Sequence, residues 1–484
     1  MDQLPFPRLP PLAGLCTQEE AAQVGWSVEE SVRRLLRLHW AEKRLMEVAH
    51  AHLPATPEWE VKCALALHQW QDAEHAHALR SRIAEMRSPV PRLDVPPDTA
   101  LDTYFEELVR VRDTIELVAG LAFTHAALAE AYRRHIAGSN PLVDHPTRRV
   151  LSFNLLEEEA AGAWCEQALA GLVSGDDVAA DRAALWRSHL ATVLRAAGGM
   201  SGDEGKEAVS VPLRSSHAFQ LDTTPRRDVR FHGVREFEFP PQVVYNMEGV
   251  PADERNLALL CRRALEMDVP ETMAAFLAER RDQPWEFYRD YARQLWDEAR
   301  HAMMGSVGLQ ARGVDWTQLP LHVGFSLRLN RHADPLERQI LLYAIEQSLM
   351  TGRRGSDSAP ERGRPEAARP DRRAPGETGK RYEYETARAA SDELSAHFHD
   401  FDWADEVLHA QIGRRWLKQE GISREEAIRR GEAIHERTWA ALEQYREPLA
   451  DPWDWWRALV REVLGRESAA QRPDGERPDI VASG

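Results

Sequence analysis

The sequence contains few cysteines and no long uninterrupted apolar run. Its four cysteines, Cys16, Cys63, Cys165 and Cys261, lie far apart and form no Cys-x-x-Cys pair. This spacing argues against a disulfide framework and against a thiolate zinc site. Prolines near the N-terminus interrupt the apolar run that a signal peptide needs, and no later apolar stretch reaches membrane-spanning length. We therefore expect a cytoplasmic protein with no membrane partner.

Positive charge is also scarce relative to negative charge. The 484 residues include 61 Lys and Arg against 78 Asp and Glu, a formal net charge of −17. The resulting field repels nucleic acid and anionic lipid, so we expect no nucleic-acid partner. Hydrophobic residues make up 43% of the chain, which suffices for packed cores in two or three domains.

Helical periodicity of apolar residues dominates the N-terminal half. After an N-terminal tail (1–24), the pattern predicts helices over about 27–53, 60–86, 101–136 and 146–173, with Pro, Gly, Ser and Asn clusters between them. Four such helices predict a four-helix bundle over 25–197. Residues 198–250 lack this periodicity, and we interpret them as an irregular linker with one short hairpin.

The helical pattern returns in the C-terminal half. It predicts helices over 252–278, 285–310, 335–351, 385–419 and 423–445, and hence a second bundle over 251–445. Within it, residues 352–380 are rich in Arg, Pro, Gly and Ser, and almost no apolar residue is present to offset the entropy of ordering them. We expect a disordered insertion there, and a C-terminal helix followed by a disordered tail in 446–484. The predicted fold is all-α, with two helical bundles in tandem.

Three helices of the second bundle carry residue types that bind metal. The pairs are Glu298 with His301 and Glu406 with His409, and Glu346 lies on the helix between them. Residues three apart share one face of a helix, so each Glu-x-x-His pair presents both side chains to one point. A carboxylate on an apolar helix face is costly unless it is paired or binds a metal. The pattern therefore predicts a dinuclear metal site inside the bundle.

The carboxylate of the first helix of this bundle has two candidates, Glu266 and Glu271. Antiparallel packing of the first two helices places Glu266 level with Glu298 and His301. In contrast, Glu271 shares the apolar stripe of its helix, whereas Glu266 shares a stripe with arginines. Pro270 distorts the helix between them, so both residues remain candidate ligands.

The order carboxylate, Glu-x-x-His, carboxylate, Glu-x-x-His over about 252–417 resembles the ferritin-like di-iron carboxylate superfamily. The runs WDEARHAMMGSVGL, YAIEQSLM and DFDWADEVLHAQIGRRW are most similar to a poorly characterised bacterial ferritin-like domain family within it. The resemblance implies two iron ions, or manganese in one or both positions. It also implies metal ligands at Glu298, His301, Glu346, Glu406 and His409. Asp297, Asp402 and Asp405 are candidates to orient an imidazole from outside this set.

The N-terminal half repeats part of the pattern. Glu42 and Glu74 are separated by the same distance along the chain as Glu266 and Glu298, and His77 follows Glu74 by three residues. Glu116 supplies a carboxylate on the third predicted helix. The fourth offers only glutamates, at 157–159, with alanine or glycine where a histidine should follow. We interpret this half as a degenerate ferritin-like bundle without a complete dinuclear site; a single-metal or carboxylate-only site is the alternative.

The predicted set of carboxylate and imidazole ligands favours oxidative chemistry. Hard carboxylate oxygens stabilise ferric iron, and two imidazoles leave coordination positions open for dioxygen. We therefore expect an O2-dependent oxidase or oxygenase that acts on an unidentified small-molecule or protein substrate and draws on an electron donor. The alternative is a non-catalytic metal-binding or scaffold protein of the same fold.

Overall fold

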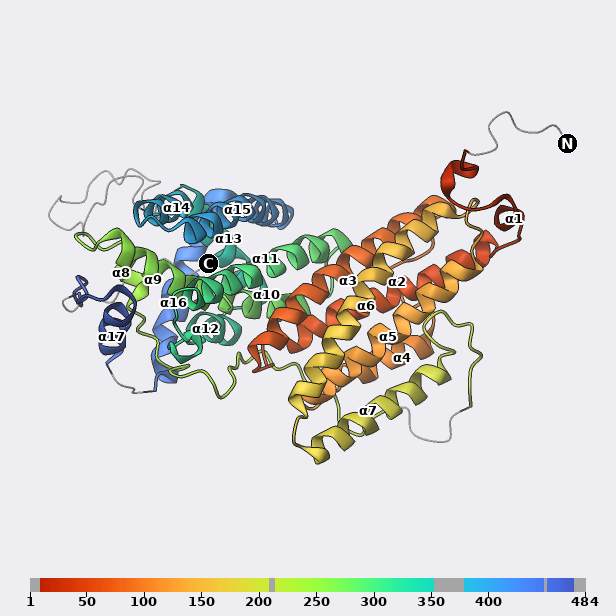
Figure 1. Cartoon of the computed structure of the whole chain (residues 1–484), viewed down its shortest axis with the longest axis horizontal. Helices are drawn as coiled ribbons and strands as arrows, with labels where there is room; N and C mark the ends of the chain where they lie inside the picture. Colours follow the sequence, from red (N-terminus) through yellow and green to blue (C-terminus); the bar gives the residue numbers. More distant parts are fainter. Residues whose placement is uncertain (1–8, 209–213, 352–377, 448–450, 474–484) are drawn as a thin grey trace. The chain divides into compact units, whose positions relative to one another are not determined.

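All regular secondary structure is helical in the residues that the structure, a computed structural model, describes: 9–208, 214–351, 378–447 and 451–473 (Figure 1). The all-α prediction is confirmed for these residues. The described part of 198–250 contains the short helix α8 (Pro241–Val244) in place of the predicted hairpin. Contacts divide the chain into two compact units. Unit 1 comprises Met1–Val48 and His68–Gln220, and unit 2 comprises Ala49–Leu67 and Leu221–Gly484.

Unit 1 is built on four long helices, of which the first two continue into the segment 49–67 of unit 2. The division by contacts thus differs from the sequence-based domain 25–197. The single helix predicted over 101–136 is two helices, because Asp113 caps a new helix by accepting a hydrogen bond from the Glu116 N–H. The helices are α1 (Gln18–Ala21), α2 (Val28–His52), α3 (Trp59–Met86), α4 (Thr99–Leu108), α5 (Thr114–Gly138), α6 (His145–Leu172) and α7 (Asp177–Ala196).

Helix α5 is the one described helix that is long and apolar enough to cross a membrane by length and composition. Its apolar window is 72% buried inside the protein. It packs against α6 and α7. This is the burial expected of the central helix of a bundle, whose apolar side chains face protein on most sides.

Unit 2 surrounds its interior with α11, α13, α15 and the consecutive pair α9 and α10. Helix α11 packs against α9, α10 and α15, and α13 packs against α10, α15 and α16. The helices are α9 (Ala252–Leu265), α10 (Asp268–Glu279), α11 (Trp285–Gln310), α12 (Gly324–His332), α13 (Pro335–Thr351), α14 (Lys380–Ala389), α15 (Glu393–Gln419), α16 (Arg424–Leu442) and α17 (Pro452–Leu464).

The predicted helix 252–278 is interrupted at Glu266 and Met267. Pro270 lacks an N–H and cannot donate to the carbonyl of Glu266, four residues earlier. That carbonyl instead accepts from the Val269 N–H at 2.9 Å. Glu266 is therefore the C-cap of α9, and α10 begins two residues later at Asp268. The interruption separates the orientations of Glu266 and Glu271.

Helices α9 and α11 approach each other closely at Gly305. A Cβ atom at this position would lie 2.2 Å from the backbone nitrogen of Ala264. Only glycine permits such an approach of two backbones. Gly305 follows His301 by about one turn of α11, and Ala264 precedes Glu266, so this contact holds the two acid-bearing segments together.

The structure describes part of each of the two segments that were predicted to be disordered. The insertion was predicted to run from 352 to 380, but Lys380 begins α14 and is buried; residues 352–377 lie outside the described residues. In the tail, Arg466 pairs with Asp253 at 2.6 Å and with Glu254 at 2.8 Å. Ionic and backbone contacts with Glu254 thus order the start of the tail, whereas 474–484 lie outside the described residues.

Candidate metal centre

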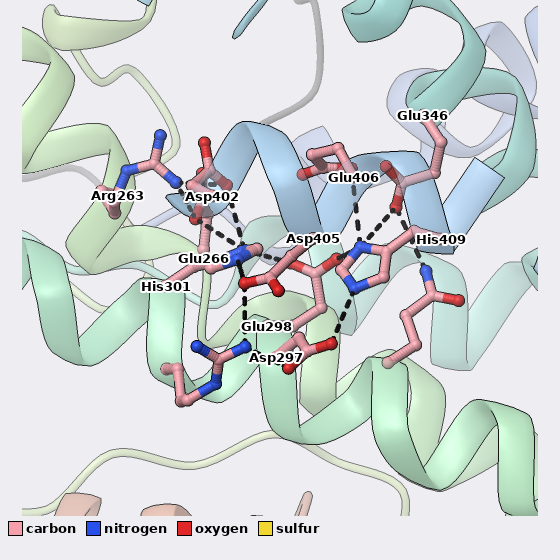
Figure 2. Close-up of polar contacts among 12 residues, drawn as sticks. Arg263, Glu266, Asp297, Glu298, His301, Glu346, Asp402, Asp405, Glu406 and His409 are labelled. Carbon is pink, nitrogen blue, oxygen red and sulfur yellow. Dashed lines mark hydrogen bonds and ion pairs between the residues drawn. The ribbon is translucent and has the colours of Figure 1, made fainter. Parts of the chain in front are cut away.

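Two adjoining groups of buried acids and histidines occupy the interior of unit 2 (Figure 2). Within each group the candidate ligand atoms lie within 4.8 Å of one another. We call them the His409 half and the His301 half. The His409 half consists of Glu298, Glu346, Glu406 and His409, and the His301 half consists of Glu266, His301 and Asp402.

Glu298 faces both halves. Its Oε1 lies 3.2 Å from Nδ1 of His409, and its Oε2 lies 3.5 Å from Nδ1 of His301. Neither oxygen has a hydrogen-bond partner in the part of the chain that the structure describes, although the side chain is fully buried. A carboxylate in this position can bridge two ions, with one oxygen directed to each.

The remaining carboxylates surround the two Nδ1 atoms. In the His409 half, Nδ1 of His409 lies 3.5 Å from Glu406 Oε2 and 3.8 Å from Glu346 Oε1. In the His301 half, Nδ1 of His301 lies 3.2 Å from Asp402 Oδ1 and 3.9 Å from Glu266 Oε2. The two imidazole rings have centroids 5.9 Å apart. Each half thus combines one imidazole with carboxylates from other helices.

The outer nitrogen of each imidazole contacts an aspartate from the opposite helix. Nε2 of His301 on α11 lies 3.1 Å from Asp405 Oδ2 on α15, and Nε2 of His409 on α15 lies 3.4 Å from Asp297 Oδ2 on α11. Arg300 pairs with both aspartates, at 2.8 Å for Asp405. Donation from Nε2 leaves the lone pair of Nδ1 directed into the centre, which is the tautomer that a metal needs.

Two buried cations also reach the centre. Arg263 Nη1 lies 2.7 Å from Asp402 Oδ1 and 3.2 Å from Glu266 Oε2. Lys380 Nζ lies 3.0 Å from Asp402 Oδ1 and 2.9 Å from Glu406 Oε1. The His301 half is therefore partly neutralised by the protein itself, whereas in the His409 half Lys380 pairs with Glu406. The two halves differ in charge.

The charges perturb the pKa values of the histidines and of Glu298. Burial by itself lowers the pKa of His301, but Asp402, Asp405 and Glu298 outweigh burial and raise that pKa to about 10. Burial opposes a raised pKa at His409 too, and contacts with Asp297 and Glu298 raise it well above the ordinary value. Burial disfavours the charged form of Glu298, yet the two histidines hold its pKa well below the ordinary range. Excess negative charge at the centre accounts for these directions.

Glu266 and Asp402 respond in opposite directions to the same surroundings. Burial raises the pKa of Glu266 to about 7, despite the nearby Arg263 and Lys380. At Asp402 these two cations outweigh burial and lower the pKa well below the ordinary value. Asp402 therefore carries the negative charge of the His301 half.

The ligand atoms meet the requirements of a cation site. Among the described residues, buried atoms without a hydrogen-bond partner include both oxygens of Glu298, Oε2 of Glu406, Oε2 of Glu346, Oδ2 of Asp402 and Nδ1 of both histidines, whereas Oε1 of Glu406 has its ion pair with Lys380. Buried polar atoms in native proteins normally have a partner, and each unpaired one costs about 1–3 kcal/mol. Divalent cations directed at these atoms would remove that cost.

Glu271 lies elsewhere in unit 2. It pairs with Lys62 and Arg227, both buried, and accepts a hydrogen bond from Ser326 Oγ at 2.9 Å. Of the two candidate residues of the first helix, the structure thus places Glu266 beside His301 and gives Glu271 its own cation partners. Glu298, His301, Glu346, Glu406 and His409 come together as their helical spacing predicts.

Three residues of the centre were not among the predicted ligands. Asp402 was considered only as an outer residue, although it lies one turn before Glu406 on the same face of α15. Arg263 is one of the arginines whose stripe Glu266 shares, and that pattern predicts no contact with a metal centre. Lys380 was assigned to the disordered insertion, and the sequence around it contains no signal for burial. Helical spacing could have identified Asp402, but not Lys380.

Comparison with known proteins gave no match: no family model matches the sequence, and no curated protein or solved structure is significantly similar to it. The resemblance to ferritin-like proteins therefore depends on the order of the motifs in the sequence and on the carboxylates and imidazoles that meet in unit 2.

Proposed function

We propose that unit 2 is a ferritin-like bundle that binds two divalent first-row metal ions, iron in the first instance, and uses them for dioxygen-dependent oxidation of an organic or protein substrate. The observation that carries the proposal is the position of Glu298. Its two oxygens lie 3.2 Å and 3.5 Å from the Nδ1 atoms of two histidines that belong to different halves. One bridging carboxylate between two imidazole-bearing halves is the arrangement expected of a dinuclear carboxylate site.

The ligand assignment follows from the two halves. Glu346, Glu406 and His409 would hold one ion, Glu266, His301 and Asp402 the other, and Glu298 both. Iron, when bound, supplies reversible one-electron oxidation and an affinity for dioxygen. Hard carboxylate oxygens suit iron and manganese, and the absence of a cysteine from both halves disfavours metals that require soft ligands.

The protein groups around the ligands have separable roles. Asp405 and Asp297 orient the imidazoles through their Nε2 atoms. Gln294 Nε2 donates to Glu346 Oε1 at 3.2 Å and fixes the direction of that carboxylate. Lys380 holds protons beside Glu406 Oε1, where it stabilises negative charge. The residues of both halves are buried, so the protein shields them from bulk solvent.

A second candidate function is metal binding without turnover, and one observation favours it. Arg263 and Lys380 already neutralise part of the His301 half. A half that contains its own cations binds a second metal ion less tightly, and a singly loaded centre suits a structural role better than dioxygen chemistry. The number of ions bound and the response to oxygen distinguish the two functions.

The test uses the full chain, stripped with a chelator under anaerobic conditions and reloaded with ferrous iron. Iron per chain is measured for the wild type, Glu298→Ala and His409→Ala, and oxygen uptake is then followed with an electrode. We expect the wild type to hold about two ions more than Glu298→Ala, because a bridging ligand serves both halves. The loaded wild type should consume oxygen, and the variants should not.

The matched control is Glu432→Ala. Glu432 and His435 form another Glu-x-x-His pair, on α16, and they do not belong to either half. The control should retain wild-type iron and oxygen uptake. A difference of less than about half an ion between the wild type and Glu298→Ala contradicts the dinuclear centre. Two bound ions without oxygen uptake would instead support the non-catalytic function.

A further inference from the structure

A third group of buried ligand-type side chains lies in unit 1, on α2, α3 and α6. It consists of Glu42, Asp72, His75 and Glu158, whose candidate ligand atoms lie within 4.8 Å of one another. All four side chains are at most 3% exposed. Glu74 and His77, the pair expected from the sequence repeat, are not in this group. Asp72 and His75, two positions earlier in the chain, take their place. They have the same three-residue spacing, with an aspartate in place of the glutamate.

In each member of this group except Asp72, one side-chain oxygen or nitrogen contacts a residue that does not belong to the group. Tyr132 donates its hydroxyl to Glu42 Oε1, His125 Nδ1 lies 2.8 Å from Glu158 Oε2, and His75 Nε2 lies 2.7 Å from Glu157 Oε2. Glu157 is a half-exposed residue at the surface of α6. The external contacts fix the orientation of each side chain.

The other atom of each of these residues faces the interior of the group. Nδ1 of His75 lies 3.4 Å from Glu42 Oε2 and 3.3 Å from Glu158 Oε1. Neither Nδ1 of His75 nor Oε2 of Glu42 makes a hydrogen bond among the described residues. Leaving such atoms unpaired in the interior is costly, and a cation between them would pair both.

The imidazole of His75 repeats the geometry of the centre in unit 2. Its Nε2 contacts an outer carboxylate, as Nε2 of His301 contacts Asp405, and its Nδ1 faces inner carboxylates. This arrangement selects the tautomer that binds a metal through Nδ1. The group differs from the unit 2 centre because Tyr132 and His125 occupy one oxygen each of Glu42 and Glu158. Those contacts leave fewer free oxygens for a second ion than the unit 2 centre has.

We propose that unit 1 binds one divalent first-row cation through Glu42, Asp72, His75 and Glu158. Three carboxylates and one imidazole are hard or borderline ligands, so manganese(II) or ferrous iron fits the set better than copper(I) or another soft ion. The site joins three helices of the bundle, and the ion stabilises their packing. This inference is independent of the function proposed for unit 2, because the two groups share no residue.

The experiment removes the unit 2 centre first. In the full-length His301→Ala/His409→Ala variant, metal-stripped protein is incubated with manganese(II) and desalted, and manganese per chain is measured. We expect about one ion per chain to remain bound, because four ligand atoms already converge in unit 1. Adding His75→Gln should lower manganese(II) affinity by at least about tenfold, since it removes a direct ligand.

Two further measurements keep the result independent of folding. Electron spin-echo modulation of bound manganese(II) should show one coupled imidazole nitrogen that His75→Gln removes. Bound manganese(II) should also raise the unfolding temperature of the His301→Ala/His409→Ala variant by mass action.

The matched control is His135→Gln, on α5 of the same unit. His135 is fully buried, and within the described ranges neither ring nitrogen has a hydrogen-bond partner, but it is not part of the group. This control should leave the manganese content and the nitrogen coupling unchanged. Absence of bound manganese in the His301→Ala/His409→Ala variant overturns the proposal. The proposal is also overturned if manganese binds but His75→Gln changes neither its affinity nor the nitrogen coupling.

Discussion

Asp405 Oδ2 lies 3.1 Å from Nε2 of His301, and the two residues belong to different helices. A second contact runs in the opposite direction between the same two helices: Asp297 Oδ2 lies 3.4 Å from Nε2 of His409. Each aspartate directly precedes the glutamate of a Glu-x-x-His pair and orients the histidine of the other pair. Helices α11 and α15 thus fix each other's ligands, and small changes in their packing act on both halves together.

The first prediction concerns this crossed contact. Asp405→Ala leaves the His301 imidazole without its outer acceptor, so the ring can rotate or change tautomer. We expect a 10–100-fold loss of ferrous iron affinity in the His301 half, the usual effect of removing such a partner. Competition with a chelator measures it. Asp400→Ala, an exposed aspartate on the same helix, should change nothing. Equal losses in the two variants would mean that the Asp405 contact has no specific role.

The second prediction concerns Lys380. Lys380→Met removes a buried positive charge that lies 3.0 Å from Asp402 and 2.9 Å from Glu406. A metal ion then no longer competes with the ammonium group, and we expect divalent metal affinity to rise by at least about tenfold. The metal-free protein should lose about 3–5 kcal/mol of stability, because the buried Glu406 loses its cation and Asp402 keeps Arg263 alone.

Titration calorimetry and thermal unfolding of metal-free protein measure the two effects of Lys380→Met. Lys418→Met, an exposed lysine on α15, is the control for both measurements. A decrease of metal affinity in Lys380→Met would show that the lysine supports the metal and does not compete with it.

The third prediction separates the roles of Glu266 and Glu271. Glu266→Gln should reduce iron binding in the His301 half without unfolding the protein. Glu271→Gln should leave iron content unchanged, but it leaves the buried Lys62 without a carboxylate and Arg227 with Asp268 alone, and it should cost about 3–5 kcal/mol of stability. Iron analysis and urea unfolding of both variants test this contrast. The reverse result, iron loss in Glu271→Gln alone, would contradict the placement.

The fourth prediction concerns pH. Burial, with Arg227 and Arg328 nearby, lowers the pKa of His322 to about 3 from 6.5. Its Nδ1 accepts a hydrogen bond from the Gly324 N–H at 3.1 Å, which requires the neutral form. As the pH falls, the unfolded chain takes up a proton before the folded chain does. The stability that neutral His322 provides is therefore complete above pH 6.5 and is lost between pH 6.5 and 3.

The pH effect is measured against His322→Asn, which keeps an acceptor near Nδ1 but does not titrate. Between about pH 7.5 and pH 5, the wild type should lose about 2 kcal/mol more stability than the variant in urea unfolding. Identical losses in the two proteins would show that His322 stays neutral in both folded and unfolded chains or titrates alike in both.

Local spacing identified the two Glu-x-x-His pairs that meet in unit 2. Residues three apart on a helix share a face whatever surrounds the helix, so Glu298 with His301, and Glu406 with His409, were predictable from the sequence. The same rule applied to Asp72 and His75 would have found the group in unit 1. Asp72 stands outside the predicted repeat because it is an aspartate and because Glu74, two residues later, has the spacing from Glu42 that Glu298 has from Glu266.

The all-helical class, the order of acid-bearing helices and the five side chains that converge in unit 2 follow from the sequence by itself, because helical periodicity is local. Tertiary structure decided the rest. The choice between Glu266 and Glu271 depended on the interruption at Pro270 and on Lys62 and Arg227, which are distant in sequence. The entry of Lys380 into the centre depended on the packing of α14 against α15. Electrostatic partners are selected by distance in space, and sequence periodicity contains no information on that distance.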